Sequence, residues 1–250
     1  MGKFINTYPV VPLRLGPSHK AEMGSQILLG EVFYIIDTAG EWLKIKLNFD
    51  NFEGWIDTDH FLLKEFTHSS SPVITDTEFE AISSLGEKLV IYPGSAIYEY
   101  DENKLSFRIG PDEYTIKQKL TFSGAGESIV DTARRFMNAP YLWGGRTPHG
   151  IDCSGLSQLC YKIHGRNIPR NSNTQACIGT VINLLSDALP GDLLFFDNAA
   201  GDIIHVAILV DNNHVIHASG GVRIDRVDHQ GIFKTDQERY SHQLRIIKRI

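Results

Sequence analysis

Long apolar segments are absent from this sequence, and no run approaches the roughly 20 consecutive apolar residues that a membrane-spanning helix needs. The first residues lack the apolar stretch and the small-residue cleavage site of a secretory signal. Asn6 also departs from the serine or threonine that myristoylation of Gly2 requires. We therefore expect no membrane partner and a cytoplasmic location. The protein would instead be exported if a signal had been removed from its N-terminus.

Cysteine is scarce as well. The chain has three cysteines, an odd number, and none of them repeats at the close spacing of metal ligands. Cys160 falls on the apolar face of a predicted helix and Cys177 in a loop-to-helix region, so we interpret both as structural. This usage agrees with a reducing compartment, and we expect neither a metal nor any other cofactor.

Positive charge is in deficit, with 24 lysines and arginines against 30 aspartates and glutamates and a formal net charge of −6. Because nucleic acids and other anionic polymers are bound mainly through cationic contacts, we expect none of them as partners. The 250 residues are 42% hydrophobic and 22% charged. That composition is typical of a soluble globular protein with one large domain or two to three small ones. We expect a monomer.

The chain begins with patterns of β-structure. Residues 1–65 contain short runs that alternate apolar and polar residues, such as 42–47, separated by turn-forming segments; we predict an all-β domain there. A polar stretch at 67–72 has the composition of a linker. Further short β-like runs make 66–122 a second β domain.

Residues 123–250 form a third predicted domain. An amphipathic pattern predicts a helix over 128–137, and a second helix and a short third one follow. Strands are predicted after these helices, at 192–196, 205–210, 214–218 and 244–250. Helices first and an antiparallel sheet afterwards indicate α+β organisation.

Cys153 stands where a Gly/Pro-rich loop meets a helical pattern, between Asp152 and Ser154. Apolar residues then recur at helical spacing up to Gly165, which can end the helix: Leu156, Leu159, Cys160 and Ile163. Cys153 therefore lies in the first turn, where unpaired N–H groups and the helix dipole favour the thiolate. The position suits a nucleophile; the alternative is a small buried hydrophobic residue.

Two histidines lie downstream, in strand-like runs on either side of the turn-forming segment 211–213. If Val210 pairs with His214 across a three-residue loop, His205 and His217 point to one face of the hairpin. They are then diagonal neighbours, roughly 7–8 Å apart. A two-residue loop would shift the register and separate them.

Five motifs follow one another in the second half of the chain: Tyr-x-Trp-Gly-Gly, Gly-x-Asp-Cys-Ser-Gly-Leu, Pro-Gly-Asp-Leu, His-Val-Ala-Ile and Ile-His-Ala-Ser. In content and order they resemble the NlpC/P60 family of papain-like cysteine peptidases. Gly-Glu-x-x-x-Ile, Trp-Leu-Lys-Ile and Gly-Trp-Ile within 1–65 resemble a bacterial SH3-like domain, and 66–122 resembles by position the second such domain of one subgroup. The resemblance implies a papain-like catalytic domain preceded by two small all-β SH3-like barrels.

A thiol mechanism follows from the residue types. Cys153 attacks the carbonyl carbon of an amide, His205 takes the proton and returns it to the leaving amine, and His217 orients His205. The oxyanion needs donors that are already in place, and the backbone N–H of Cys153 is one candidate. The resemblance implies Tyr141, twelve residues before Cys153, as the other. By composition alone Tyr141 would be a packing residue.

The substrate is implied by the resemblance alone. Members with SH3-like domains resemble γ-D-glutamyl-L-diamino acid endopeptidases, which recycle murein peptides by cutting between D-Glu and diaminopimelate or lysine when the N-terminal L-Ala is free. Carboxylates must meet that ammonium, and hydroxyl or amide donors must meet the D-Glu carboxylate. Asp152 matches the family's amine-binding aspartate, and Ser154 and Ser172 match its carboxylate-binding serines. Glu22 matches a second amine-binding acid; its other interpretation is a solvated loop carboxylate.

One position departs from the subgroup. Phe52 stands where the subgroup has a tyrosine that helps to hold the amine, so the wall is kept but a hydrogen bond worth about 0.5–1.5 kcal/mol is lost. Amine selection is then looser unless another group supplies the contact. Because Glu22 belongs to a different domain, we expect the first SH3-like domain to close one end of the cleft and exclude longer wall fragments.

Three alternatives stay open on the sequence. The same thiol core serves amidases and acyltransferases. SH3-like domains with a degenerate peptidase domain would make a non-catalytic wall-peptide-binding protein, although the Cys/His/His set is intact. Cys153, His205 and His217 are also possible metal ligands, but they are far apart in sequence and no fourth ligand is evident.

Overall fold

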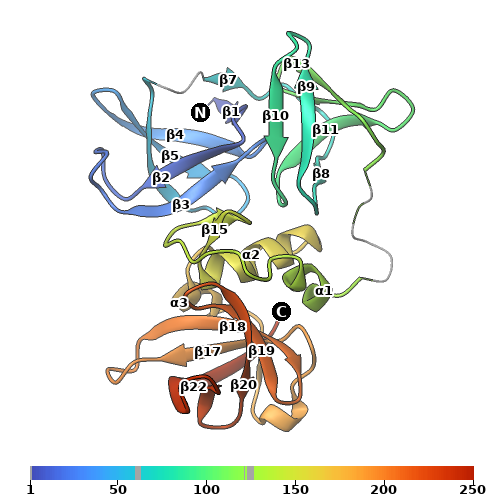
Figure 1. Cartoon of the computed structure of the whole chain (residues 1–250). Helices are drawn as coiled ribbons and strands as arrows, with labels where there is room; N and C mark the ends of the chain where they lie inside the picture. The colour runs from blue at the N-terminus through green and yellow to red at the C-terminus, as the bar shows by residue number, and fades with distance from the viewer. Residues whose placement is uncertain (1, 60–62, 121, 123–126) are drawn as a thin grey trace. The chain divides into compact units, whose positions relative to one another are not determined.

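The computed structural model of the chain describes residues 2–59, 63–120, 122 and 127–250 (Figure 1). The chain divides into two compact units, residues 1–123 and 124–250, each built around its own buried apolar side chains. The first unit contains two sheets. The division into three domains stays a prediction.

The first sheet of the N-terminal unit is antiparallel and has seven strands in the order β3-β2-β6-β5-β4-β1-β7. The strands are β1 (Lys3–Ile5), β2 (Val10–Arg14), β3 (Met23–Leu28), β4 (Val32–Ala39), β5 (Trp42–Leu47), β6 (Glu53–Asp57) and β7 (Lys64–Glu65). The alternation in 42–47 has the expected effect, because Ile45 and Leu47 are fully buried. They pack in one cluster with Leu13, Ile27, Phe33 and Ile56.

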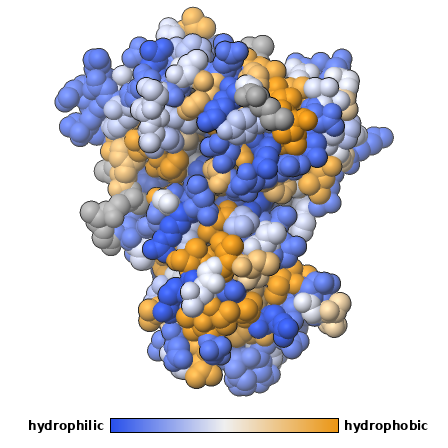
Figure 2. All heavy atoms as spheres, turned by 180° about the vertical axis from the view of Figure 1, so that it is seen from behind, coloured by the Kyte–Doolittle hydropathy of each residue, from blue (hydrophilic) through white to orange (hydrophobic). Residues whose placement is uncertain are grey.

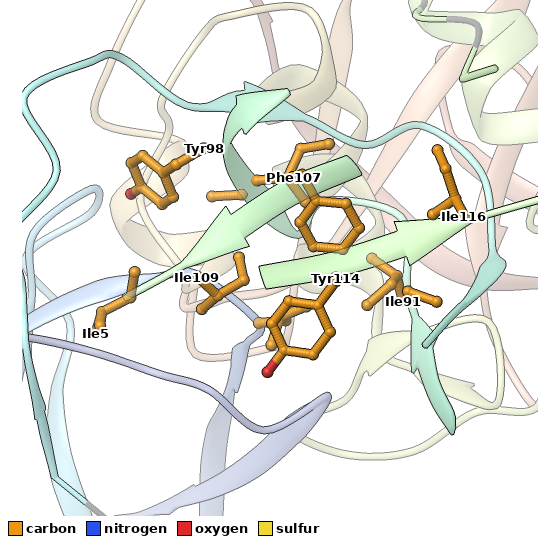
Figure 3. Close-up of a cluster of buried hydrophobic side chains, with 11 residues drawn as sticks. Ile5, Ile91, Tyr98, Phe107, Ile109, Tyr114 and Ile116 are labelled. Carbon is orange, nitrogen blue, oxygen red and sulfur yellow. The ribbon is translucent and has the colours of Figure 1, made fainter. Parts of the chain in front are cut away.

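The second sheet has six antiparallel strands in the order β10-β9-β13-β12-β11-β8. They are β8 (Val73–Ile74), β9 (Phe79–Ser83), β10 (Lys88–Ile91), β11 (Ala96–Asp101), β12 (Ser106–Ile109) and β13 (Asp112–Ile116). Figure 3 shows its core, in which the rings of Phe107 and Tyr114 stack at 5.3 Å. Ile5 of β1 lies in the same cluster, so the two sheets share buried apolar contacts.

Backbone contacts also join the two sheets. The Ala96 N–H donates to the Leu29 carbonyl at 2.9 Å, and the Tyr98 hydroxyl donates to the Gly30 carbonyl at 3.1 Å. Gly30 has φ +74°, and a Cβ atom there would lie 1.7 Å from the Ala96 carbonyl oxygen. Only glycine fits this junction. These contacts hold the two sheets of the N-terminal unit against each other.

The C-terminal unit begins with helices and ends with strands. The helices are α1 (Ile129–Arg134), α2 (Cys153–Ile163), α3 (Ser172–Gln175) and the 3-10 turn η1 (Leu185–Asp187). The strands are β14 (Arg146–Thr147), β15 (Gly150–Ile151), β16 (Thr180–Ile182), β17 (Leu193–Asp197), β18 (Ile203–Asp211), β19 (His214–Ala218), β20 (Val222–Val227), β21 (Gly231–Lys234) and β22 (Arg239–Arg249). The α+β order is as expected, but the sequence did not predict β14, β15, β16, β20 and β21. The predicted short helix toward Leu185 is also wrong, because strand β16 and the turn η1 lie there.

The large sheet of this unit closes on itself. Its order is β16-β22-β17-β18-β19-β20-β21, and β21 also pairs with β22. One face encloses a buried cluster that includes Ala207, Leu209, Val215 and Val227. Helices α1 and α2 pack against β18 and β19 (Figure 1). The start of α2 is thereby placed beside the central strands.

The surface carries both polar and apolar side chains, and Figure 2 shows one face. Large apolar residues of the C-terminal unit are more than one-third exposed at several places: Tyr141, Leu142, Trp143, Val181, Leu184, Leu189, Ile204 and Tyr240. Among the described residues, no helix is both long and apolar enough to cross a membrane.

Candidate active site

Cys153 is the first residue of α2, and Asp152 is the N-cap of that helix. The Asp152 carboxylate accepts the backbone N–H of Gly155 at 2.7 Å, which fixes where the helix begins. Cys153 is 8% exposed, and its thiol lies within hydrogen-bond reach of the Val206 backbone N–H on β18. The helix start therefore meets β18 at the residue next to His205.

The Cys153 thiol is protonated at rest. Burial raises the pKa of this thiol to about 12, and the charge of Asp152 adds to the rise. The Val206 N–H and the Arg170 guanidinium lower the pKa, but only in part. The sequence predicted that the helix N-terminus would favour the thiolate; burial outweighs that effect. Attack by Cys153 therefore requires a base.

The hairpin β18–β19 uses a different turn from the expected one. Asp211 pairs with His214 across a two-residue turn, whereas the sequence predicted that Val210 would do so across three residues. A bulge between Leu209 and Asp211 adds one residue to β18 and compensates for the shorter turn. Ile208 consequently pairs with Ile216, the register needed to keep both histidines on one face.

His205 and His217 form a hydrogen-bonded pair, with 2.8 Å between His205 Nε2 and His217 Nδ1. They continue the core-facing rows of β18 and β19, two residues from Ala207 and Val215. Burial lowers the pKa of His205 well below 6.5, and the neighbouring His217 adds to this. Burial also lowers the pKa of His217, although its hydrogen bond to Asp225 opposes the change. Both rings are therefore neutral near pH 7.

Asp225 on β20 extends the pair, and the sequence analysis missed it. Its Oδ2 lies 3.0 Å from His217 Nε2, and its Oδ1 accepts from Arg223 Nη2 at 2.8 Å. Arg223 in turn donates to Asp236. Burial alone would raise the pKa of Asp225, but the hydrogen bonds from His217 and Arg223 hold it below its usual range. Asp225 is two residues before the core residue Val227, so both lie on the same face of the strand. A strand predicted over 222–227 would have placed Asp225 on the core face.

A third histidine lies against the pair. The His242 ring of β22 stacks on His205 with 4.2 Å between centroids and 21° between planes. Burial, His217 and Lys234 lower the pKa of His242, which falls to about 4. The ring is uncharged near pH 7, and its position beside His205 contributes to the low pKa of His205. The last predicted strand begins at Leu244 and therefore leaves out His242, which lies in β22.

Tyr141 lies near the thiol. A β-bridge joins it to Ile151, two residues before Cys153, and its side chain is 37% exposed. Burial raises the pKa of Tyr141 to about 12, and the negative charge of Asp152 adds to the rise. The hydroxyl therefore keeps its proton and can donate a hydrogen bond.

Asp152 forms a buried ion pair with Arg170. Two guanidinium nitrogens of Arg170 donate to the two carboxylate oxygens, at 2.9 and 2.7 Å, and the Gly144 N–H donates to Oδ2 at 2.7 Å. The side chains of Arg170 and Asp152 are 1% and 7% exposed. The carboxylate thus ties the loop before α2, the helix start and the loop at 170 together. The sequence predicts no role for Arg170.

The two predicted carboxylate-binding serines lie in different surroundings. Ser154 is buried; its hydroxyl accepts from Arg170 Nη1 at 2.8 Å and donates to Asp152 at 3.2 Å. Ser172 is half-buried and begins α3. The Gln175 side chain of α3 donates to the Ser154 carbonyl at 3.0 Å, which holds the short helix against α2.

The remaining predicted site residues belong to the N-terminal unit. Glu22 is exposed, and its carbonyl accepts the Leu15 N–H at 2.9 Å. Phe52 is half-buried and packs against the core of the first sheet. Their roles toward a substrate stay predictions. Among the described residues, no group of three or more His, Cys, Asp or Glu is placed to hold one metal ion.

Two segments match known families. Residues 138–240 match the NlpC/P60 family, and residues 13–61 match the bacterial dipeptidyl-peptidase Sh3 domain. The first match contains Cys153, His205 and His217, and the second contains Glu22 and Phe52. Of the two expected SH3-like barrels, the match covers one.

Two relatives resemble the chain over most of its length. The γ-D-glutamyl-L-lysine dipeptidyl-peptidase of Bacillus cereus is 27% identical over 79% of this chain and 67% of that protein. The enzyme of the same name from Bacillus subtilis is 29% identical over 82% of this chain and 75% of that protein.

One solved structure, an NlpC/P60 family protein from Bacillus cereus ATCC 10987, superposes with a TM-score of 0.81. It is 19% identical and covers 99% of each chain, which shows a common fold. The fold is mostly sheet, with an SH3 domain ahead of the NlpC/P60 domain. The chain is thus a cysteine peptidase that carries an NlpC/P60 domain at residues 138–240, preceded at residues 13–61 by an SH3 domain of the bacterial dipeptidyl-peptidase type.

Proposed function

We propose that this enzyme hydrolyses the bond between γ-D-Glu and a diamino acid in murein peptides whose N-terminal L-Ala is free, during the recycling of cell-wall peptides. One observation carries the proposal: a thiol at a helix start lies beside a strand whose histidine is bonded to a second histidine. It is supported by relatives named for this cleavage that align with about four-fifths of the chain. Diaminopimelate and lysine are both candidates for the third residue.

The reaction begins with two neutral groups. The Cys153 proton passes to His205 while the sulfur attacks the γ-carbonyl carbon. The transfer does not come before the attack, because burial disfavours a thiolate and an imidazolium in the resting site. His217 accepts the Nε2–H of His205 and so leaves Nδ1 to take that proton. The backbone N–H of Cys153 and the Tyr141 hydroxyl then stabilise the oxyanion.

The second half of the reaction regenerates the thiol. The C–N bond breaks, the imidazolium of His205 gives its proton to the departing amine, and Cys153 is left as a thioester. His205 then takes a proton from water, which attacks the thioester carbon. The S–C bond breaks, the sulfur recovers a proton from His205, and the dipeptide L-Ala-D-Glu leaves.

Substrate selection depends on the two charged ends of the dipeptide. We assign the ammonium to Asp152 and Glu22, and the D-Glu carboxylate to Ser154 and Ser172. Both oxygens of Asp152 already accept from Arg170, so an ammonium would share them and gain less than at an unpaired carboxylate. Phe52 cannot add a hydrogen bond. We therefore expect moderate selectivity for the free amine.

The finer features of the architecture are also proposals. We propose that residues 66–122 form a second SH3-like domain, since they fold as a six-stranded antiparallel sheet. The papain-like character of 123–250 is supported by a nucleophile on a helix that packs against an antiparallel sheet carrying the base. We further propose a cytoplasmic monomer.

The test is mass spectrometry of L-Ala-γ-D-Glu-diaminopimelate and its lysine analogue after incubation with the protein. Release of L-Ala-D-Glu by the unchanged protein and not by Cys153→Ala supports the proposal. Cys177→Ala is the matched control, since this exposed thiol lies outside the site, and it should cleave normally. Failure to cleave either peptide would refute the assigned bond. Equal cleavage of the N-acetylated peptide would refute the amine requirement.

A further inference from the structure

The hydrogen bonds behind His205 have a direction. An ionised Asp225 can only accept, so the 3.0 Å contact must be a donation from His217 Nε2–H. Since His217 is neutral, its Nδ1 then carries a lone pair and must accept from His205 Nε2–H at 2.8 Å. His205 thus keeps its proton on Nε2. Its Nδ1 is the nitrogen left with a lone pair.

We propose that Asp225 is a positioning residue that, acting through His217, holds His205 in the tautomer able to accept the Cys153 proton. The inference rests on the proposed thiol mechanism. Asp225 does not touch the substrate in this scheme. Its effect is exerted through two buried hydrogen bonds, and the side chains of His217 and Asp225 are 0% and 4% exposed.

Arg223 makes the proposal testable, because it determines which atom of the side chain at position 225 faces His217. Its Nη2 donates to Asp225 Oδ1 at 2.8 Å, and a guanidinium cannot accept. In Asp225→Asn the amide oxygen would therefore stay with Arg223, and the amide nitrogen would face His217. His217 Nε2 would then accept and its Nδ1 would donate to His205. The proton of His205 would move to Nδ1, where it blocks transfer from Cys153.

Other groups near the histidines are common to every variant. Lys234 donates to Ser219 at 3.1 Å, and His242 stacks on His205. Asp236 holds Arg223 from the surface side. None of these side chains is substituted in the variants below, and Arg223→Ala removes the Arg223–Asp236 contact together with the Arg223–Asp225 contact.

The kinetic test compares Asp225→Asn with Asp225→Asn/Arg223→Ala. The single variant should lose about 100- to 10,000-fold in kcat with little change in KM, as expected for a base held in the wrong tautomer. In the double variant the amide can turn its oxygen toward His217, and kcat should recover at least about tenfold. Asp211→Asn breaks an exposed Asp–His contact at the turn of the same hairpin, away from His205 and His217, and should keep normal activity. A double variant no faster than the single one would overturn the proposal.

A second measurement needs no substrate. Ring 15N NMR of the resting protein should show His205 protonated at Nε2 and His217 also at Nε2, and in Asp225→Asn both protons should move to Nδ1. A wild-type His205 that carries its proton on Nδ1 would overturn the proposal even if Asp225→Asn failed to fold. If the wild-type protein cleaves no murein peptide, the assigned function fails, while the NMR result still decides the tautomer.

Discussion

Burial determines the state of each reacting side chain. It raises the pKa of Cys153 and lowers the pKa values of His205 and His217, so that all three are uncharged near pH 7 before the reaction begins. A charge appears only when substrate reacts. Donors that meet the oxyanion at that moment therefore matter more than groups that stabilise a resting thiolate.

Removing the Tyr141 hydroxyl should slow the chemical step. Because it is a proposed oxyanion donor, Tyr141→Phe should lower kcat about 100-fold with KM changed by less than about threefold. Steady-state kinetics on the free tripeptide measure both constants. Tyr34→Phe removes an exposed hydroxyl bonded to Asn48 and should leave them unchanged. If Tyr141→Phe keeps more than half of kcat, the backbone N–H of Cys153 suffices and Tyr141 is a packing residue.

Local patterns predicted the elements that carry the nucleophile and the base. Helical spacing placed Cys153 at the start of α2, and strand composition predicted the hairpin. The turn was predicted incorrectly because a bulge can absorb a residue that composition does not reveal. Strand β20 was missed because the charged residues Arg223, Asp225 and Arg226 interrupt its apolar residues. The burial of Asp225 depends on His217, a partner outside the local sequence.

The start of α2 depends on the buried Asp152–Arg170 pair. Asp152→Asn keeps a good helix cap but leaves the Arg170 charge buried and poorly paired, so we expect a loss of about 3–5 kcal/mol in the free energy of unfolding. Asp152→Asn/Arg170→Met removes both charges and should recover part of that loss. Urea unfolding followed by circular dichroism measures the differences.

The half-exposed pair Lys44–Glu53 provides the control for that series. Lys44→Met should cost no more than about 1 kcal/mol, because solvent screens the pair. An equally small cost for Asp152→Asn would mean that the Arg170 charge is compensated without Asp152, and that the pair does not hold the helix start in place.

At the scale of the whole molecule, contacts between segments that are far apart in the sequence could not be predicted. Short strands predicted the β-structure of residues 1–122, but they did not predict the contacts of Ile5 and Gly30 between the two sheets, which depend on a single φ and on shared burial. In the C-terminal unit, Asp225 reaches His217 because β20 pairs with β19, and His242 reaches His205 from β22, which pairs with β17 beside β18. The local pattern of a strand does not show which strands it pairs with.

The same burial should make the stability of the protein depend on pH in both directions. His205, His217 and His242 have pKa values below 6.5 when folded, so the unfolded chain binds more protons and stability should fall as pH drops below about 6.5. Cys153 and Cys160 have raised pKa values when folded, so stability should fall again as pH rises above about 9. Urea unfolding at intervals from pH 5 to pH 10 should show a plateau between these limits.

His242→Phe removes one titrating ring. It should reduce the slope of the free energy of unfolding against pH on the acid side by up to about 1.4 kcal/mol per pH unit, leaving the slope on the alkaline side unchanged. Stability that is constant from pH 7 to pH 5 would show that these rings are not buried in neutral form, and the thiol–imidazole resting state would be wrong.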